Sequence, residues 1–157
     1  MGTEIERKFL VRDLSVLAGV PGTAFRQGYL STDPERSVRV RRSGDLAFVT
    51  VKGITGPSGT TRAEFEYSIP PGDADAMLDE LALRPLIEKT RYRVEDGGRL
   101  WEIDVFSGAN EGLVVAEVEL ATEDAAVEVP AWVGGEVTGD ARYYNANLVA
   151  HPYRGWA

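Results

Sequence analysis

The sequence predicts a mainly β protein of the α+β class, in which eight antiparallel strands close into a barrel tunnel with a few flanking helices. Three observations lead to this prediction. Eight stretches alternate apolar and polar residues, turn-forming residues separate most of them, and helical periodicity is scarce. The chain of 157 residues suits one domain over residues 1–157, and no repeat or long linker divides it.

Eight segments show the two-residue period that a strand imposes, because successive side chains of a strand point to opposite faces. These segments are residues 3–11, 24–32, 36–43, 46–53, 61–69, 87–96, 99–107 and 112–121. Turn-forming residues stand between most of them, at 33–34, 43–45, 53–59, 96–98 and 110–112. The turn from Glu95 to Arg99 predicts a hairpin.

Three short segments have helical character. Residues 13–18 end before a glycine, and residues 73–81 follow the breaker Pro70-Pro71-Gly72. Residues 140–148 begin at Asp140, whose side chain is suited to an N-cap. We expect these helices to pack outside the barrel or across one of its ends.

The composition excludes several classes of protein. With no cysteine, the chain has no disulfide, no thiolate chemistry and no zinc–cysteine site. A net charge of −8 disfavours a nucleic-acid partner, and the single histidine, His151, argues against a histidine-based mechanism. No apolar run approaches the ~20 residues of a membrane span, and no basic, then apolar leader opens the chain. We therefore predict a cytoplasmic protein with no membrane partner.

The polar positions of the predicted strands are almost all ionic. Strand by strand they are Glu4, Glu6 and Lys8; Arg39 and Arg41; Lys52; Arg62, Glu64 and Glu66; Lys89, Arg91 and Arg93; Glu102 and Asp104; and Glu117 and Glu119. The opposite faces of these strands are apolar. Two arrangements satisfy the pattern: an apolar core with a solvated ladder of ion pairs, which stabilises little, or a polar bore with a covered apolar exterior.

The separation of the two signs of charge favours the polar bore. The pairs Glu102/Asp104 and Glu117/Glu119 are purely acidic, whereas Arg39/Arg41 is purely basic. A surface that serves solubility mixes both signs. Clustered carboxylates call for a divalent cation, and clustered cations call for a polyanion. Since oxygen ligands favour Mg²⁺ or Mn²⁺, the residues point to a metal-bound polyphosphate inside the barrel.

The residues also resemble a known family. Its blocks appear in order as Glu4-Ile5-Glu6-Arg7-Lys8, Gln27-Gly28-Tyr29-Leu30, Val38-Arg39-Val40-Arg41, Thr50-Val51-Lys52-Gly53, Arg62 with Glu64 and Glu66, Glu88-Lys89-Thr90-Arg91, Trp101-Glu102-Ile103-Asp104, Ala116-Glu117-Val118-Glu119, and Val137-Thr138-Gly139-Asp140 with Arg142, Tyr143, Asn145 and Leu148. Together they are similar to the CYTH superfamily, the triphosphate tunnel metalloenzymes. Among these, the chain looks most like the short bacterial members.

The resemblance implies roles for twelve residues. The carboxylates that it assigns to metal binding are Glu4, Glu6, Glu64, Glu66, Glu117 and Glu119. The cations that it assigns to the triphosphate are Lys8, Arg39, Arg41, Lys52, Lys89 and Arg91. Catalytic roles are predicted for Glu64 or Glu119, which would orient the attacking water, and for Lys8, which would contact phosphate or position Glu6. Asp104 would hold a basic residue in place, and Arg62 and Arg93 are left outside this set as ordinary ion-pair partners.

The activity that the resemblance implies is metal-dependent hydrolysis of the terminal phosphate of a triphosphate, with Mg²⁺ or Mn²⁺ as cofactor. Inorganic triphosphate is the predicted substrate, because no motif for recognising a base is evident. The alternatives are thiamine triphosphate hydrolysis, cyclisation of ATP, and a non-catalytic module that binds polyphosphate. A homodimer remains open, because either a second subunit or the chain's own helices would cover an apolar barrel exterior.

Overall fold

The computed structural model describes residues 2–156 and consists of a strongly curved antiparallel sheet with short helices at its margins. The strands are β1 (Gly2–Val11), β2 (Gly22–Ser31), β3 (Ser37–Ser43), β4 (Leu46–Lys52), β5 (Thr61–Ser68), β6 (Ile87–Asp96), β7 (Arg99–Ser107), β8 (Val114–Glu119) and β9 (Val133–Glu136). The α-helices are α1 (Pro71–Glu80) and α2 (Asn147–Ala150), and the 3₁₀ turns are η1 (Leu14–Leu17), η2 (Gly108–Asn110), η3 (Ala141–Tyr143) and η4 (Tyr153–Gly155).

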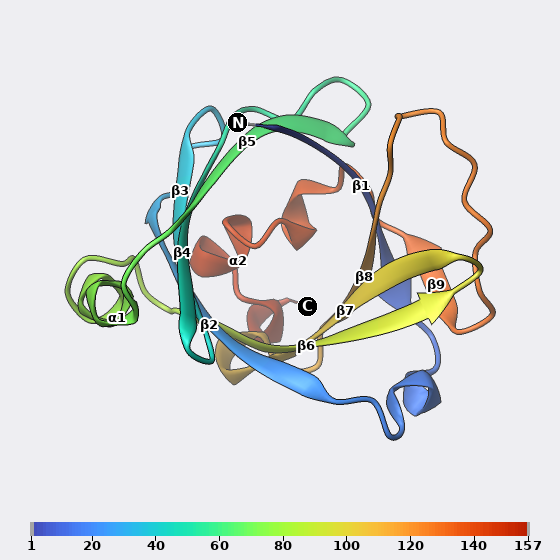
Figure 1. Cartoon of the computed structure of the whole chain (residues 1–157), viewed down its shortest axis with the longest axis horizontal. Helices are drawn as coiled ribbons and strands as arrows, with labels where there is room; N and C mark the ends of the chain where they lie inside the picture. The colour runs from blue at the N-terminus through green and yellow to red at the C-terminus, as the bar shows by residue number, and fades with distance from the viewer. Residues whose placement is uncertain (1, 157) are drawn as a thin grey trace.

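Eight of the strands close into a ring, which confirms the predicted barrel (Figure 1). Neighbouring strands follow the order β5-β4-β3-β2-β6-β7-β8-β1, and β1 closes the ring by pairing with β5. At that closure Glu4 stands opposite Arg62, while on the other edge of β1 Glu6 stands opposite Glu119. The first and last strands of the predicted set are therefore neighbours, as a closed barrel requires.

The sequence analysis did not predict strand β9. This strand is four residues long, contains two glycines and pairs with β1 beside Phe9 and Val11. Glycine is disfavoured in strands, and so short a segment shows no alternation. Strand β5 pairs with only the first residues of β1, so the later part of that edge is free, and β9 forms by pairing with it. The predicted hairpin between β6 and β7 is present, and it turns at Gly97 and Gly98, which have φ angles of +61° and +75°.

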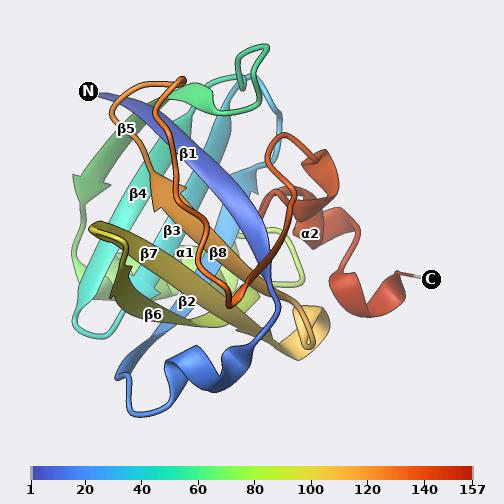
Figure 2. The same ribbon diagram turned by 90° about the vertical axis from the view of Figure 1, so that its right-hand side faces the viewer.

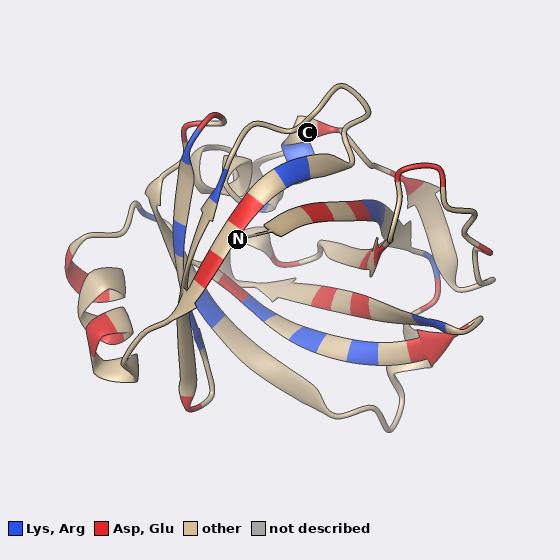
Figure 3. Ribbon diagram, turned by 45° about the horizontal axis from the view of Figure 1, so that its top comes forward, with Lys and Arg blue, Asp and Glu red and all other residues tan. Residues whose placement is uncertain are grey.

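Charged residues recur at alternate positions along the strands (Figure 3). Their side chains line the cavity inside the barrel, whereas many apolar residues of the strands pack in clusters on its outer side. On the outer side of β1, β7 and β8, the fully buried Trp101 packs edge-on between Phe9 and Trp132, with ring centroids 5.6 and 5.4 Å apart. The loop that connects β8 to β9 covers this cluster. Over β3 and β4 the cover is α1, whose Ala74 and Leu78 are completely buried. The chain's own segments therefore shield much of the apolar exterior from water.

One end of the bore is apolar, which the sequence analysis did not predict. The C-terminal segment, residues 140–156, lies across that end of the barrel (Figures 1 and 2). Its Tyr143, Leu148 and Val149 pack with residues of the strands that include Phe106 and Val115. The ionic part of the bore is thus floored by a hydrophobic cluster, which leaves the charged cavity open toward the opposite end.

The three predicted helices differ in outcome. The predicted helix over residues 73–81 corresponds to α1, which ends at Glu80 and begins at Pro71, a position where proline is favoured because its missing N–H needs no partner. Residues 13–18 form only the 3₁₀ turn η1, and residues 140–148 divide into η3 and α2. The predicted N-cap is confirmed, since the side chain of Asp140 accepts a hydrogen bond from the backbone N–H of Arg142 at 3.1 Å. None of the helices in residues 2–156 has the length and apolar character that a membrane crossing requires.

Replacing Leu78 by alanine should reduce the free energy of unfolding by roughly 2–5 kcal/mol, because a fully buried leucine leaves a cavity between α1 and the barrel. The control is Leu81→Ala one turn further on, where the side chain is 65% exposed and the loss should be well under about 1 kcal/mol. Urea denaturation measures both. Equal losses for the two variants would show that α1 does not protect the outer face of β3 and β4.

Candidate functional site

A single large cavity of about 1010 Å³ occupies the charged part of the bore. All twelve residues that were predicted to bind metal or triphosphate lie on its wall: Glu4, Glu6, Lys8, Arg39, Arg41, Lys52, Glu64, Glu66, Lys89, Arg91, Glu117 and Glu119. They come from β1, β3, β4, β5, β6 and β8, which only a closed barrel brings to one space. The structure therefore gathers the predicted set, while the role of each member stays a prediction.

Carboxylates on β1 and β8 form the acidic wall. Burial raises the pKa of Glu6 well above its ordinary value, and the carboxylates of Glu117 and Glu4 raise it further. Burial alone would also raise the pKa of Glu117, but Lys8 and Arg91 outweigh it and hold that pKa well below the usual range. The ammonium of Lys8 lies 3.7 Å from Glu117. This wall therefore holds more negative charge at close range than its own cations offset, which suits a bound cation.

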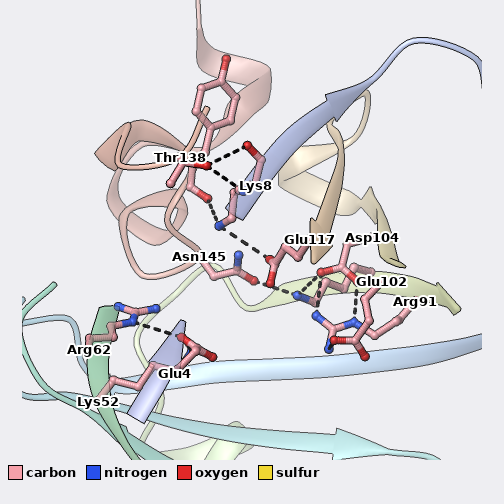
Figure 4. Close-up of polar contacts among 12 residues, drawn as sticks. Glu4, Lys8, Lys52, Arg62, Arg91, Glu102, Asp104, Glu117, Thr138 and Asn145 are labelled. Atoms are coloured by element: carbon pink, nitrogen blue, oxygen red, sulfur yellow. Dashed lines mark hydrogen bonds and ion pairs between the residues drawn. The ribbon is translucent and has the colours of Figure 1, made fainter. Parts of the chain in front are cut away.

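The basic wall is organised around Asp104, which has no exposed surface. Its carboxylate accepts hydrogen bonds from Nε and Nη2 of Arg91 at 2.8 and 2.9 Å and from Nζ of Lys89 at 2.7 Å (Figure 4). Burial alone would raise the pKa of Asp104, but Lys89 and Arg91 lower it to about 2. The predicted role of Asp104 as a holder of basic residues agrees with this geometry.

Two cations of this wall carry charge that the surrounding carboxylates do not balance. Burial lowers the pKa of Lys89 to about 7 against the attraction of Asp104, and the neighbouring cations Arg91 and Arg41 lower it further. Asp104 does not offset this burial, because the same carboxylate also accepts two hydrogen bonds from Arg91. Burial, Arg39 and Arg91 likewise lower the pKa of Arg41 to about 9. A polyanion in the cavity would supply the missing negative charge.

The contacts of Arg41 and Arg39 also show positive charge and N–H donors that the protein does not fully pair. Within residues 2–156, no carboxylate lies within ion-pair distance of Arg41, whose Nε donates instead to Oε1 of Gln27 at 2.9 Å. The Nε of Arg39 is also buried, and no atom of residues 2–156 accepts a hydrogen bond from it. Unpaired buried donors are costly, so their presence in a cavity wall points to an acceptor that belongs there.

Ion pairs link the two walls. Lys52 donates to Glu4 at 2.9 Å and lies 3.6 Å from Glu64, while Arg39 lies 3.5 Å from Glu66. Arg62 reaches Glu4 at 3.5 Å and lines the cavity, so the structure brings into the site a residue that the sequence analysis had set aside. Arg62 can be recognised as a site residue only when the pairing of β1 with β5 is known, because that pairing closes the barrel and places Arg62 opposite Glu4.

Two uncharged residues in the site were not given roles from the sequence. Gln27 is fully buried and donates from Nε2 to Oδ1 of Asn145 at 2.8 Å, and the same oxygen accepts from Nζ of Lys89 at 3.0 Å. Neither residue adds to a charge pattern, so the argument from separated signs could not find them. Arg93 also lines the cavity, but its side chain is 54% exposed and pairs with Glu102 at 3.3 Å, as expected of an ordinary ion-pair partner.

The donor chemistry of the acidic wall fits a hard divalent cation. Within residues 2–156, no three acidic or histidine side chains converge into a metal site built from protein alone. Mg²⁺ is usually held by one or two carboxylates and completed by water and substrate phosphates. Burial first, and then the carboxylates of Glu117 and Glu4, raise the pKa of Glu6, and a bound divalent cation would favour its charged form against both causes.

The buried amine of Lys89 should give the protein a characteristic pH dependence of stability. Its pKa of about 7 lies below the roughly 10.4 of an unfolded chain, so the native state binds fewer protons between these values. The cost of burying the charged amine is therefore full below pH 7 and diminishes as the pH rises. Relative to Lys89→Met, the wild type should gain about 2 kcal/mol of unfolding free energy between pH 7 and about pH 9. Parallel curves in urea denaturation would contradict this.

The fold and site define a class: closed antiparallel barrels whose bore sets surplus cations against clustered carboxylates, an arrangement suited to a polyanion together with a cation. The chain belongs to the CYTH domain family, whose profile matches residues 2–153. An inorganic triphosphatase of Acetivibrio thermocellus is 48% identical over 154 residues, covering 98% of this chain and 97% of that protein. One of Nitrosomonas europaea is 40% identical over 153 residues, covering 93% and 96%. A crystal structure of an inorganic triphosphatase superposes with a TM-score of 0.67 at 36% identity, covering 92% of this chain and 96% of that one.

Proposed function

We propose that this chain is a metal-dependent triphosphatase that hydrolyses inorganic triphosphate to pyrophosphate and orthophosphate. The observation that carries the proposal is the surplus of buried positive charge around Arg41 in a cavity that also holds clustered carboxylates. The inorganic triphosphatases at 48% and 40% identity match nearly the whole chain and support the same activity.

The proposed binding set for the triphosphate is Lys8, Arg39, Arg41, Lys52, Lys89 and Arg91. The guanidinium of an arginine can grip two phosphate oxygens at once, whereas a lysine supplies a compact charge. Arg91 and Lys89 are anchored by Asp104, so they need little reorganisation when an anion binds. As negative charge shifts over the phosphate oxygens during the reaction, fixed cations of this kind stabilise it.

The proposed metal-binding set is Glu4, Glu6, Glu64, Glu66, Glu117 and Glu119, with Mg²⁺ or Mn²⁺ as the ion. When bound, such an ion polarises phosphate oxygens and makes a coordinated water more acidic. The pKa of Glu6 supports its place in this set, because a carboxylate held close to two others gains most from a cation. Glu66 has other partners as well, since it accepts a hydrogen bond from Thr50 at 2.7 Å and lies 3.5 Å from Arg39.

The proposed catalytic residues are Glu64 or Glu119 and Lys8. Burial and the neighbouring Glu4 raise the pKa of Glu64, which makes this carboxylate a better proton acceptor and supports it as the residue that orients water. Lys8 donates to the backbone carbonyl of Tyr143 at 3.1 Å and lies beside Glu117. Those contacts support a role for Lys8 in holding Glu117 or a phosphate oxygen.

A matrix of metals and substrates tests the proposal. Purified protein is incubated with Mg²⁺, Mn²⁺ or chelator, and with triphosphate, ATP or thiamine triphosphate, and released phosphate is measured. We expect phosphate release from triphosphate with either metal and none with chelator. A preference for thiamine triphosphate or formation of cyclic AMP would favour an organic substrate. Tight binding without turnover under every condition would support the non-catalytic module and overturn the proposal.

We propose further that the chain forms one domain over residues 1–157, is located in the cytoplasm, and acts on a small-molecule triphosphate with neither nucleic acid nor membrane as partner. A homodimer stays open, because α1 and the β8–β9 loop cover much of the apolar exterior, while Tyr67 on β5 remains 58% exposed. Light scattering of the purified protein measures the subunit number directly.

A further inference from the structure

Asn145, in the C-terminal segment that floors the bore, reaches the charged cavity. Its Oδ1 accepts hydrogen bonds from Nε2 of Gln27 and Nζ of Lys89. An ammonium group can only donate, so the side of the amide that faces Lys89 must be the carbonyl oxygen. The amide nitrogen consequently lies on the other side. Exchanging the oxygen and nitrogen by a 180° flip of the amide would place an N–H donor against the ammonium of Lys89.

The free side of this amide faces the cavity. Figure 4 shows the amide nitrogen of Asn145 on the side where Lys8 and Glu117 lie. Within residues 2–156, no protein atom accepts a hydrogen bond from this Nδ2 group, although Asn145 lines both the large cavity and a second one of about 150 Å³ beside it. Because two groups already engage the oxygen of this amide, its N–H donor is held in place at the wall of the cavity.

We propose that Asn145 is a further substrate-contacting residue, which donates a hydrogen bond from Nδ2 to a non-bridging oxygen of the bound triphosphate. The proposal rests on the proposed function, since it assumes that a phosphate oxygen occupies the space between Lys8 and Lys89. It also gives the C-terminal segment a part in substrate binding in addition to closing one end of the barrel.

Hydrogen bonds hold this donor in register with the phosphate-binding cations. Gln27 accepts from Nε of Arg41 at 2.9 Å and donates to Asn145, which in turn accepts from Lys89. The chain Arg41–Gln27–Asn145–Lys89 thus joins cations on β3 and β6 through β2 and the C-terminal segment. Such an arrangement fixes the donor before the anion arrives, so little order has to be created on binding.

Two substitutions at this position separate contact from support. Asn145→Ala removes both the acceptor and the donor, whereas Asn145→Asp keeps an acceptor for Lys89 and Gln27 but replaces the N–H group by an oxygen. Calorimetry with inorganic triphosphate and metal-free protein measures the dissociation constant without turnover. We expect Asn145→Ala to weaken binding about 10-fold or more, as for a lost hydrogen bond to a charged group, and Asn145→Asp to weaken it further.

The control is Asn147→Ala, two residues along the same segment. The side chain of Asn147 donates to the backbone carbonyl of Ala141 at 2.7 Å, so this variant disturbs the segment and leaves the proposed donor in place. It should bind triphosphate as the wild type does. Binding by Asn145→Ala equal to that of the wild type, or stronger binding by Asn145→Asp than by Asn145→Ala, would overturn the proposal. If wild-type protein hydrolyses triphosphate, that outcome defeats this inference alone, whereas an inactive wild type defeats the proposed function.

Discussion

Replacing Glu117 by glutamine should reduce the turnover of triphosphate by at least about 100-fold, because the acidic wall loses a charge for which glutamine supplies no substitute. Glu117 stands opposite Glu102 on β7 and Lys8 on β1, and its pKa is held low by Lys8 and Arg91. Glutamine has the same shape and retains an oxygen acceptor, so the barrel should stay folded. Metal-dependent phosphate release at saturating triphosphate measures the loss.

The same variant separates catalysis from binding. Removing a negative charge close to the basic wall should leave the affinity of metal-free protein for triphosphate unchanged or make it stronger. Glu88→Gln is the matched control, since Glu88 is exposed on β6 and lies outside the cavity lining. That control should keep full activity. Wild-type turnover by Glu117→Gln would remove Glu117 from the catalytic apparatus and would count against a metal held on β1 and β8.

Replacing Asp104 by asparagine should reduce the free energy of unfolding by roughly 3–5 kcal/mol, because Lys89 and Arg91 would lose their shared counter-charge in a buried site. All three hydrogen bonds to Asp104 involve side chains that are at least nine-tenths buried. Triphosphate binding should weaken as well, since both cations would lose their fixed positions. Urea denaturation and calorimetry measure the two effects.

Asp79→Asn is the matched control for that prediction. Asp79 on α1 pairs with Arg26 at 2.7 Å, but the two side chains are 62% and 38% exposed. An exposed ion pair contributes about 0–1 kcal/mol, so the control should hardly change stability. If Asp104→Asn proved as stable as this control, Asp104 would not be the support of the basic wall.

Much of the barrel could be predicted from the sequence because a strand displays its two faces in alternate residues. Arg39 and Arg41, or Glu102 and Asp104, reveal their shared face by spacing alone. Strand β9 lay beyond this kind of argument, since Gly134 and Gly135 carry no pattern and the strand exists only because β1 offers an edge. For residues 140–148 the sequence allowed a position outside the barrel or across one of its ends, and only the fold shows that Tyr143 and Leu148 pack against the strands at one end.

The sequence by itself determined which side chains share a face and which sign each face carries, because both follow from local geometry and residue type. The separation of the two signs favoured charged faces that point inward, but a solvated ladder of ion pairs around an apolar core fitted the same alternation. Tertiary structure decided between the two arrangements, since covering Trp101 and Leu78 from outside makes an ionic interior possible. Closure also decided which charges meet, pairing Arg62 with Glu4 and placing Asn145 beside Lys89. Contacts between residues far apart in the chain depend on strand register and closure, which no local pattern encodes.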